Sequence, residues 1–331
     1  MAVTMADISK LRSLTGAGMM DCKKALQEAD GDIEAAKEII RKKGQAVAAK
    51  REDREAAEGC VVAKNDGDFA AIVALKCETD FVAKNAGFVA LTKKILDAAV
   101  AARAKSLDEV KALSIDGKVC ADLIVEEVGK TGEKMELGFY EYVEGPATIA
   151  YNHFGNKLAT LVAFSKAGIN EQVFKNVAMQ VAAMNPIAVD ECDVPEEVKE
   201  KETAVAIEKT KMEQVQKAVD AALKKAGINP AHVDSEDHME SNKAKGWITE
   251  EDVTKAKEII ATVSAEKAAN LPEAMIQNIA KGRLAKFLKE VCLLNQEDVT
   301  SDDKKAVRET LKAIDPELKV LSFKRVNLNV D

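Results

Sequence analysis

The hydrophobic positions of residues 4–44 recur every three or four residues, which is the spacing of one face of an α-helix. Thr4 and Asp7 match a capping box at the start of the first such segment. Glycines near 16–18 and at 31 divide the pattern into three. We therefore predict a three-helix bundle over residues 1–45, with Gly44 at its end. Its apolar positions are Ile8, Leu11 and Leu14, then Cys22, Ala25, Leu26 and Ala29, then Ile33, Ala36, Ile39 and Ile40.

The pattern changes after this bundle. Residues 46–58 consist mainly of alanine and charged residues without an apolar stripe, so we expect a linker, either helical or loose. Apolar runs at 60–63 and 69–75 flank the turn sequence Asn-Asp-Gly-Asp, which predicts a β-hairpin. Helical spacing from Phe88 to Ala99, a second helix near 119–128 and an extended segment at 135–143 complete a unit assigned to residues 59–145.

A second hairpin followed by a helix begins near Ala147. Apolar runs at 148–151 and 158–164 flank His153–Asn156, and helical spacing follows from Val173 to Met184. The repetition predicts a core of two related halves. The second half is assigned to residues 146–195 and 270–331. It ends with helices over 272–288 and near 307–314 and a strand over 320–326.

Between these parts lies a long helical pattern. Val198, Val205, Met212 and Val219 recur every seven residues, which is typical of a coiled-coil seam. A second amphipathic run returns after a polar stretch at 231–247. We expect residues 196–269 to form a protruding antiparallel coiled-coil hairpin. The spacing is compatible with pairing within the chain and with pairing across a dimer. The predicted fold class is α+β.

Composition narrows the function classes. The chain has 331 residues, of which 47% are hydrophobic and 31% charged, with a net charge of −8. These values are typical of a globular protein with a sizeable core. An acidic chain gains little from neutralising phosphates, so we expect no direct nucleic-acid binding. No run approaches the roughly 18 apolar residues of a membrane helix. The N-terminus lacks the features of a signal or transit peptide, so we expect a cytoplasmic protein without a membrane partner.

The six cysteines are scattered and form no Cys-x-x-Cys pair. This spacing argues against a zinc site and against a disulfide framework. We expect small buried thiols in a reducing compartment.

Motifs for catalysis are weak. Gly16–Asp21 resembles part of a dinucleotide-binding loop, but it follows a predicted helix and its third glycine position is Asp21. No phosphate-loop motif occurs. His232 and His238 could contribute to the metal site of a hydrolase, although a polar hairpin tip explains them as well. His153 has no recognisable nucleophile beside it. We therefore expect no enzyme chemistry, no cofactor and no metal.

Two apolar features favour binding instead. Phe81 follows Asp80 directly in a predicted turn between a strand and a helix. It either stays exposed or folds back into the core. Met19 and Met20 are adjacent, so one helix cannot easily bury both. They form an exposed binding surface or pack on the next domain.

Two longer runs give these features a context. Leu14–Leu26 (LTGAGMMDCKKAL) and Thr79–Asn85 (TDFVAKN) resemble the bacterial elongation factor Ts family. Looser similarity continues at 131–133, 151–153 and 282–287, and it covers most of the chain. Residues 217–265 lie outside the pattern and look like an insertion that lengthens the hairpin.

The resemblance implies guanine nucleotide exchange on elongation factor Tu, the GTPase that carries aminoacyl-tRNA to the ribosome. It also implies that the N-terminal bundle is similar to ubiquitin-associated domains and docks on the GTPase domain. The core holds the exchange site, and its second half reaches a distal GTPase domain.

Residue roles follow from the same resemblance. Asp80 and Phe81 would enter near the Mg²⁺ and phosphates of the GTPase, with Phe81 as an apolar wedge and Asp80 holding the turn. The full set of implied contacts is Met19, Met20, Lys23, Thr79, Asp80, Phe81, Val82, Gly132 and His153. His153 is followed here by Phe-Gly-Asn, which departs from the family turn. The alternative function is a non-catalytic interaction scaffold that uses the bundle and the coiled coil.

Overall fold

A computed structural model describes residues 3–329. These residues fall into two compact units. The first contains the chain up to Val189 together with the segment from Gln296 onward, and the second contains Asp190–Asn295. None of the described helices is both long and apolar enough to cross a membrane.

The first unit begins with a bundle of three helices, α1 (Met5–Thr15), α2 (Met19–Glu28) and α3 (Ile33–Lys50). The predicted capping box is present, because Thr4 Oγ1 accepts from the Asp7 amide and the Asp7 side chain accepts from the Thr4 amide. Ile8, Leu11, Cys22, Leu26 and Ala36 are among the buried residues of its core. The predicted inward positions are thus largely confirmed.

Two details of the predicted bundle are wrong. Leu14 is 55% exposed and does not share the buried face of Ile8 and Leu11. The third helix does not end at Gly44 but continues to Lys50. The reason is a close helix crossing, since the Gly44 Cα lies 2.9 Å from where a Cβ on Gly129 would stand. Glycine at this point allows two backbones to approach and does not terminate the helix.

The core of the first unit contains two three-stranded antiparallel sheets with the same topology. In each sheet a hairpin is followed by helical segments and then by a third strand, which pairs with the second strand of the hairpin. The register shifts near the end of that second strand in both sheets, at Ala74/Leu75 and at Ala163/Phe164. The first sheet consists of β1 (Glu58–Asp66), β2 (Phe69–Cys77) and β5 (Met135–Glu144), and the second of β6 (Ala147–Asn152), β7 (Leu158–Phe164) and β8 (Val320–Asn327).

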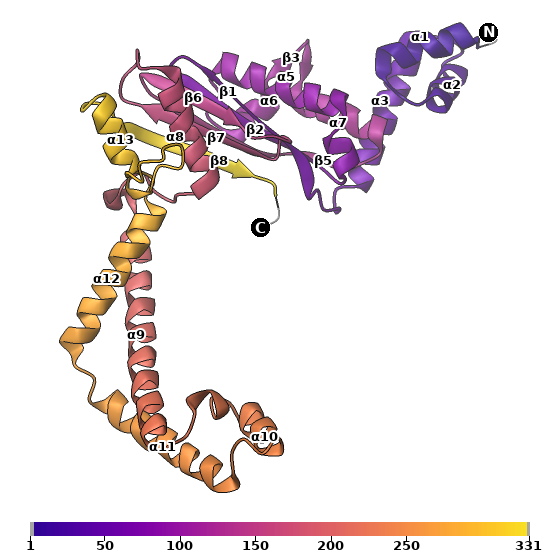
Figure 1. Cartoon of the computed structure of the whole chain (residues 1–331). Coiled ribbons are helices and arrows are strands. Elements are labelled where there is room, and N and C mark those ends of the chain that lie inside the picture. The colour runs from indigo at the N-terminus through magenta and orange to yellow at the C-terminus, as the bar shows by residue number, and fades with distance from the viewer. Residues whose placement is uncertain (1–2, 330–331) are drawn as a thin grey trace. The chain divides into compact units, whose positions relative to one another are not determined.

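The helices of the core lie on the outer faces of these sheets (Figure 1). The first sheet is covered by α5 (Ala86–Ala102), α6 (Leu107–Ala112) and α7 (Cys120–Thr131), and the second by α8 (Glu171–Met184). A short ribbon, β3 (Ser114–Ile115) with β4 (Lys118–Val119), precedes α7, and α13 (Val307–Ile314) precedes β8. The sequence pattern predicted neither α6 nor this ribbon.

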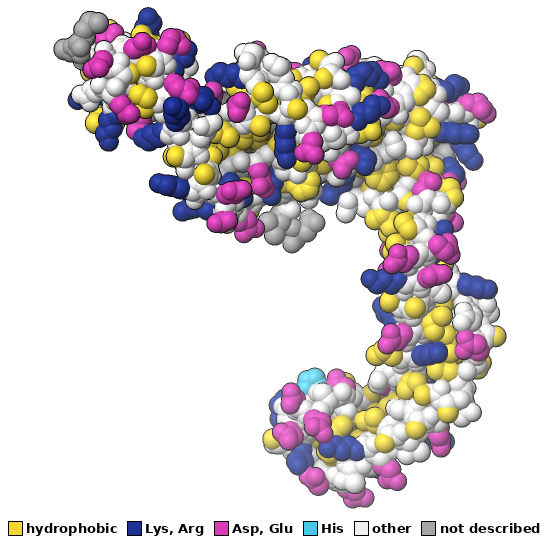
Figure 2. All heavy atoms as spheres, turned by 180° about the vertical axis from the view of Figure 1, so that it is seen from behind, with side chains coloured by type: hydrophobic (Ala, Val, Ile, Leu, Met, Phe, Trp, Pro, Cys, Tyr) yellow, Lys and Arg dark blue, Asp and Glu magenta, His cyan; other side chains and the backbone are white. Residues whose placement is uncertain are grey.

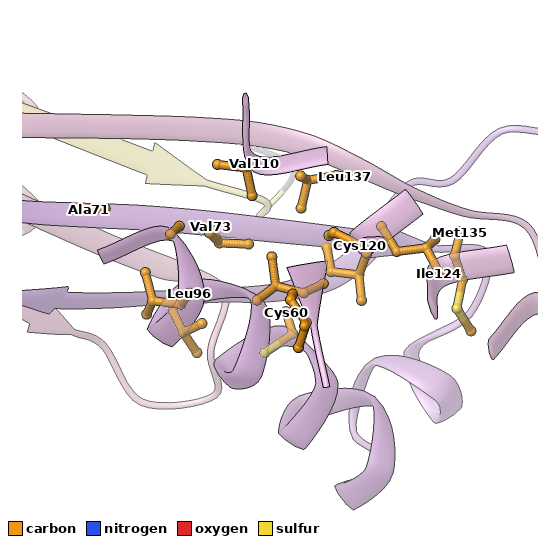
Figure 3. Close-up of a cluster of buried hydrophobic side chains, with 14 of the residues drawn as sticks. Cys60, Ala71, Val73, Leu96, Val110, Cys120, Ile124, Met135 and Leu137 are labelled. Atoms are coloured by element: carbon orange, nitrogen blue, oxygen red, sulfur yellow. The ribbon is translucent and has the colours of Figure 1, made fainter. Parts of the chain in front are cut away.

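The layered arrangement explains why β1 and β2 are apolar on both faces. Cys60, Ala71 and Val73 point towards the helices, in the cluster drawn in Figure 3. Val61 and Ile72 point the other way and pack against Leu161 of the second sheet. Successive side chains of a strand alternate between its faces, and β2 is buried on both.

The second unit is helical. Its long helix α9 (Glu196–Lys225) is followed by the short α10 (Glu236–Ala244) and by α11 (Glu250–Ala269) and α12 (Glu273–Val291). The chain runs along α9 and returns along α11 and α12, as Figure 1 shows. Single 3-10 turns lie at Glu191–Asp193, Pro230–His232 and Leu293–Asn295.

The predicted heptad seam of α9 is only partly correct. Val219 is buried in a small core together with Leu223, Val253 and Ala256. Val205 and Met212 are exposed, although they share the seven-residue spacing. The reason is that α12 contacts a neighbouring face of α9, where Ala206 and Thr210 are the buried residues.

Candidate functional site

Phe81 lies on a single helical turn, α4 (Asp80–Ala83), between β2 and α5. Thr79 caps this turn, since its Oγ1 accepts from the Val82 amide at 3.4 Å. Phe81 is 83% exposed, so the alternative in which it folds back into its own core is wrong. The next residue, Val82, is half-buried against the core cluster. The turn thus anchors one apolar side chain inward and presents the aromatic one to solvent.

A carboxylate from a distant segment holds this turn in place. Glu133 accepts from the Thr79 amide at 3.1 Å and from the Thr79 hydroxyl at 2.7 Å. Glu133 follows Gly132, which ends α7 in the left-handed conformation with φ +73°. The structure therefore brings Gly132 beside Thr79–Val82, as a joint site requires.

A second carboxylate braces the same region from the other side. Glu78 accepts from the Lys134 amide at 2.6 Å and from Arg51 and Arg54 at 3.0 and 2.9 Å. The Lys134 amide, followed by the two guanidinium groups, lowers the pKa of Glu78 from 4.5 to about 2. Glu78 therefore joins the end of α3, the end of β2 and the start of β5.

Asp80 pairs with Lys84 one turn later, with 2.6 Å between the carboxylate and Nζ. The hydrogen bond from Lys84 lowers the pKa of Asp80, which stays ionised at neutral pH. Asp80 thus has a partner within its own turn, beside the exposed Phe81.

A second exposed surface lies on α2. Met19 is 47% and Met20 is 61% exposed, and Lys23 is also exposed. The helix buries Cys22, Ala25 and Leu26 instead, which leaves positions 19, 20 and 23 together on the outer face. Neither methionine is packed away.

This bundle surface connects to the loop after α7. The turn before α2 is close-packed, since a side chain at Gly16 would come within 3.0 Å of Lys130 Cδ. Lys130 lies two residues before Gly132. The start of α2 and the Gly132–Glu133 loop are therefore near neighbours.

His153 lies at the exposed turn between β6 and β7. Its Nδ1 is 2.9 Å from the Tyr151 hydroxyl, which fixes the ring orientation. Two hydrogen bonds join the turn to β1. The Asn152 side-chain oxygen accepts from the Ala63 amide at 2.7 Å, and the Asn156 carbonyl accepts from the Val61 amide at 2.7 Å.

The most exposed aromatic in this turn was missed by sequence reasoning. Phe154 is 97% exposed and stands between His153 and Gly155. The sequence does carry a signal for an exposed turn here, since Gly155 and Asn156 are residue types that favour the left-handed conformation. The structure gives them φ values of +87° and +53°. A large apolar residue at the tip of such a turn has no core to enter.

Both aromatic turns occupy the same end of the core. Lys157, directly after the β6–β7 turn, forms an ion pair with Glu58 at the start of β1. Glu58 is paired in register with Cys77, the last residue of β2 before the Phe81 turn. Phe81 and Phe154 therefore project from one rim of the two sheets.

The hydrolase alternative gains no support. His238 pairs with Asp234, and the His232 ring contacts that of Trp247 in a tilted arrangement with 5.5 Å between ring centres. Across residues 3–329, no three His, Cys, Asp or Glu side chains are grouped so that they could hold a metal ion.

The cysteines are free thiols within the described chain, and five of the six are buried as expected. Burial raises the pKa of Cys77, beside the Phe81 turn, to about 12. Cys192 is the exception, because it is exposed on a 3-10 turn.

Sequence comparison shows to which family the chain is similar. A family model described as "Elongation factor TS" matches residues 78–226 and 211–329. Proteins named elongation factor Ts from Parabacteroides distasonis and Bacteroides thetaiotaomicron are each 70% identical over the full length of both chains. The elongation factor Ts of Porphyromonas gingivalis is 45% identical, again over the full length.

Proposed function

Because the chain belongs to the elongation factor Ts family, we propose that it is a guanine nucleotide exchange factor that binds elongation factor Tu·GDP and releases the GDP. Loading of GTP then follows from the cellular excess of GTP. The factor performs no covalent chemistry of its own, uses no cofactor and acts in the cytoplasm. The observation that carries the proposal is the 83% exposed Phe81 on a braced turn.

The mechanism is a wedge. A GTPase grips GDP through phosphate-loop amides and a Mg²⁺ ion. The exchange factor must stabilise a GTPase conformation that grips the nucleotide poorly. Phe81 enters beside the metal and phosphate site and separates the elements that organise it. Asp80, held by Lys84, and Thr79, held by Glu133, keep the wedge in one orientation, which lowers the entropic cost of binding.

The remaining contacts extend the same interface. Met19, Met20 and Lys23 dock the bundle on the GTPase domain, and Gly132 lies beside the wedge. His153 and Phe154 provide a second apolar contact from the same rim of the core, as their exposure supports. Exposed aromatic side chains are frequent energetic centres of protein interfaces.

Thermodynamic linkage limits how the factor works. If binding of the exchange factor lowers the affinity of elongation factor Tu for GDP by a given ratio, GDP must lower the affinity of elongation factor Tu for the exchange factor by the same ratio. The two therefore compete through a short-lived ternary complex.

The test is stopped-flow release of a fluorescent GDP from elongation factor Tu, with and without this protein. We expect strong acceleration by the wild type. Phe81→Ala should lower the rate at subsaturating concentration at least about 30-fold, the effect of losing an interface centre worth about 2 kcal/mol. Phe154→Ala should lower it about fivefold to tenfold, corresponding to about 1–1.4 kcal/mol.

The matched control is Phe139→Ala. Phe139 is 45% exposed but lies in the middle of β5, opposite Ala74. The Phe139→Ala substitution should leave the rate of GDP release unchanged. Acceleration retained by a folded Phe81→Ala variant would refute the wedge and leave the function standing. No acceleration by the wild type would refute the function and favour the interaction scaffold.

A further inference from the structure

The helix α3 belongs to two hydrophobic clusters at once. In its first half, Ala36 is buried in the core of the three-helix bundle, and Ile39 packs against the same core. Near its end, Val47 and Ala48 pack against the cluster between the first sheet and its helices. One uninterrupted helix, Ile33–Lys50, spans both clusters. Because rigid helices transmit movements between the parts they contact, α3 connects the bundle to the core.

Glu78 joins the end of this helix to the Phe81 turn. Arg51, the C-cap of α3, donates from Nη1 to both carboxylate oxygens of Glu78 at 3.0 and 3.2 Å. Arg54, in the turn that follows α3, donates to Glu78 Oε2 at 2.9 Å. The next residue after Glu78 is Thr79, which caps the turn that carries Phe81. One carboxylate therefore holds the helix end beside the start of the turn.

This connection is partly shielded from solvent. The side chain of Glu78 is 13% exposed and that of Arg51 is 30% exposed. Water and salt screen a partly buried ion pair less than an exposed one. Lys134 closes the same connection, since its amide donates to Glu78 at 2.6 Å and its Nζ donates to the Glu52 carbonyl at 2.7 Å. The contacts thus come from the segment after α3, from the end of β2 and from the start of β5.

We propose that Glu78 is a positioning residue that fixes the orientation of the bundle relative to the Phe81 turn, so that both surfaces meet the GTPase together. The inference rests on the proposed exchange function, in which Met20 docks the bundle and Phe81 is the wedge. A second contact that is held in the right place acts at a high effective concentration. Loosening the connection lowers that concentration, although every contact residue is still present.

Glu78→Gln tests the connection with little change in side-chain shape. Its amide oxygen can replace Oε1 and accept from the Lys134 amide, but its amide nitrogen cannot accept from Arg54. Charged side chains of both signs are spread over the surface of the first unit (Figure 2), so the test needs a matched pair elsewhere. Asp68→Asn is this control. Asp68 directly precedes β2 and accepts from Arg103, the C-cap of α5, at 2.7 and 3.1 Å.

The first experiment measures the distance distribution between two spin labels by pulsed electron paramagnetic resonance, in the full chain without elongation factor Tu. The labels are attached at Glu28→Cys in α2 and Lys93→Cys in α5, which are exposed positions. The background is Cys192→Ser, since Cys192 is an exposed thiol. The otherwise unchanged chain should give one narrow distribution. Glu78→Gln should broaden it at least about twofold, because the bundle can then reorient about the end of α3, and Asp68→Asn should leave its width unchanged.

A second variant removes the same connection from the other side. Arg51→Ala combined with Arg54→Ala should broaden the distribution as much as Glu78→Gln does. Adding Glu78→Gln to this pair should cause no further broadening, as expected for one shared interaction. Each variant should keep the wild-type circular dichroism spectrum, which separates a loosened connection from an unfolded chain.

The second experiment is stopped-flow GDP release from elongation factor Tu across a titration of each variant. Met20→Ala should raise the concentration for half-maximal acceleration at least about tenfold in the wild type, but less than about threefold in the Glu78→Gln background. The maximal rate of Glu78→Gln should stay within about twofold of the wild type, because Phe81 remains present. If Glu78 acted only on stability, Met20→Ala would have the same effect in both backgrounds.

Four results bear against these expectations. An unchanged distribution width in a folded Glu78→Gln variant would overturn the proposal, and so would equal broadening by Asp68→Asn. Equal effects of Met20→Ala in the two backgrounds would overturn the coupling of the two surfaces. If the wild type does not accelerate GDP release, the exchange function is refuted, and the spin-label distances still decide whether Glu78 fixes the bundle.

Discussion

Replacing Glu133 by alanine should weaken exchange, although Glu133 itself is not among the residues that we propose to contact the GTPase. Glu133 holds the Phe81 turn through two hydrogen bonds to Thr79, at 3.1 and 2.7 Å. Hydrogen bonds to a charged group contribute about 1.5–3 kcal/mol each when both partners are desolvated. Glu133 is only half-buried, and water replaces part of the interaction. We therefore expect the turn to lose about 1–2 kcal/mol of its preference for the wedge orientation.

Part of the binding free energy must then be used to order the turn when the GTPase binds, so the affinity falls. The concentration needed for half-maximal acceleration should rise about 5- to 30-fold, since each 1.4 kcal/mol corresponds to a factor of ten. The maximal rate at saturation should change less than about twofold, because Phe81 remains present once bound. Stopped-flow GDP release across a titration of the variant separates these two parameters.

The control is Glu144→Gln at the opposite end of β5. Glu144 also carries a paired carboxylate, bonded to Lys105 at 2.7 Å, but it lies far along the strand from the Phe81 turn. It should leave both parameters unchanged. An unchanged half-saturation for a folded Glu133→Ala variant would refute the reasoning, and so would a fall in the maximal rate alone.

Two further predictions concern stability. Glu78 has a lowered pKa in the fold, so the stability that its carboxylate contributes is present above its ordinary pKa of 4.5 and is lost as pH falls towards about 2. The difference in melting temperature between wild type and Glu78→Gln should therefore narrow below pH 4.5. A difference that stays constant with pH would contradict this prediction. Gly129→Ala places a Cβ 2.9 Å from Gly44 Cα and should cost about 1–3 kcal/mol in thermal unfolding. Gly282→Ala, where the added Cβ meets open space, should instead stabilise by about 0.5–1 kcal/mol, and equal effects of the two alanines would refute the close-packing argument.

The sequence alone determined most of the local structure. The capping box at Thr4, the helix over 307–314 and the two hairpins depend on residues that are neighbours along the chain. Their signals are spacing, caps and turn residues, and these act over a few positions. The runs at 14–26 and 79–85 likewise indicate the family, and the similar proteins confirm it.

Only the tertiary structure decided which of two similar residues is buried. Val205 and Val219 have equivalent places in the heptad, yet one is exposed and the other lies in a core, because different helices contact the two halves of α9. Gly44 looks like a helix end in the sequence, and its real role becomes clear only beside Gly129.

The wedge site shows the same division. The sequence predicts that Phe81 lies in a turn. Its exposure depends on two further contacts: Val82 packs against the core, and Glu133, 54 residues away, accepts a hydrogen bond from Thr79. Phe154 joins it at one rim because Lys157 pairs with Glu58 across 99 residues. Periodicity and capping report interactions between residues close in the chain. Which side chains are buried, which turns are held by distant carboxylates and which turns lie close together depend on contacts between residues far apart in the chain. The local sequence does not indicate which residues form these contacts.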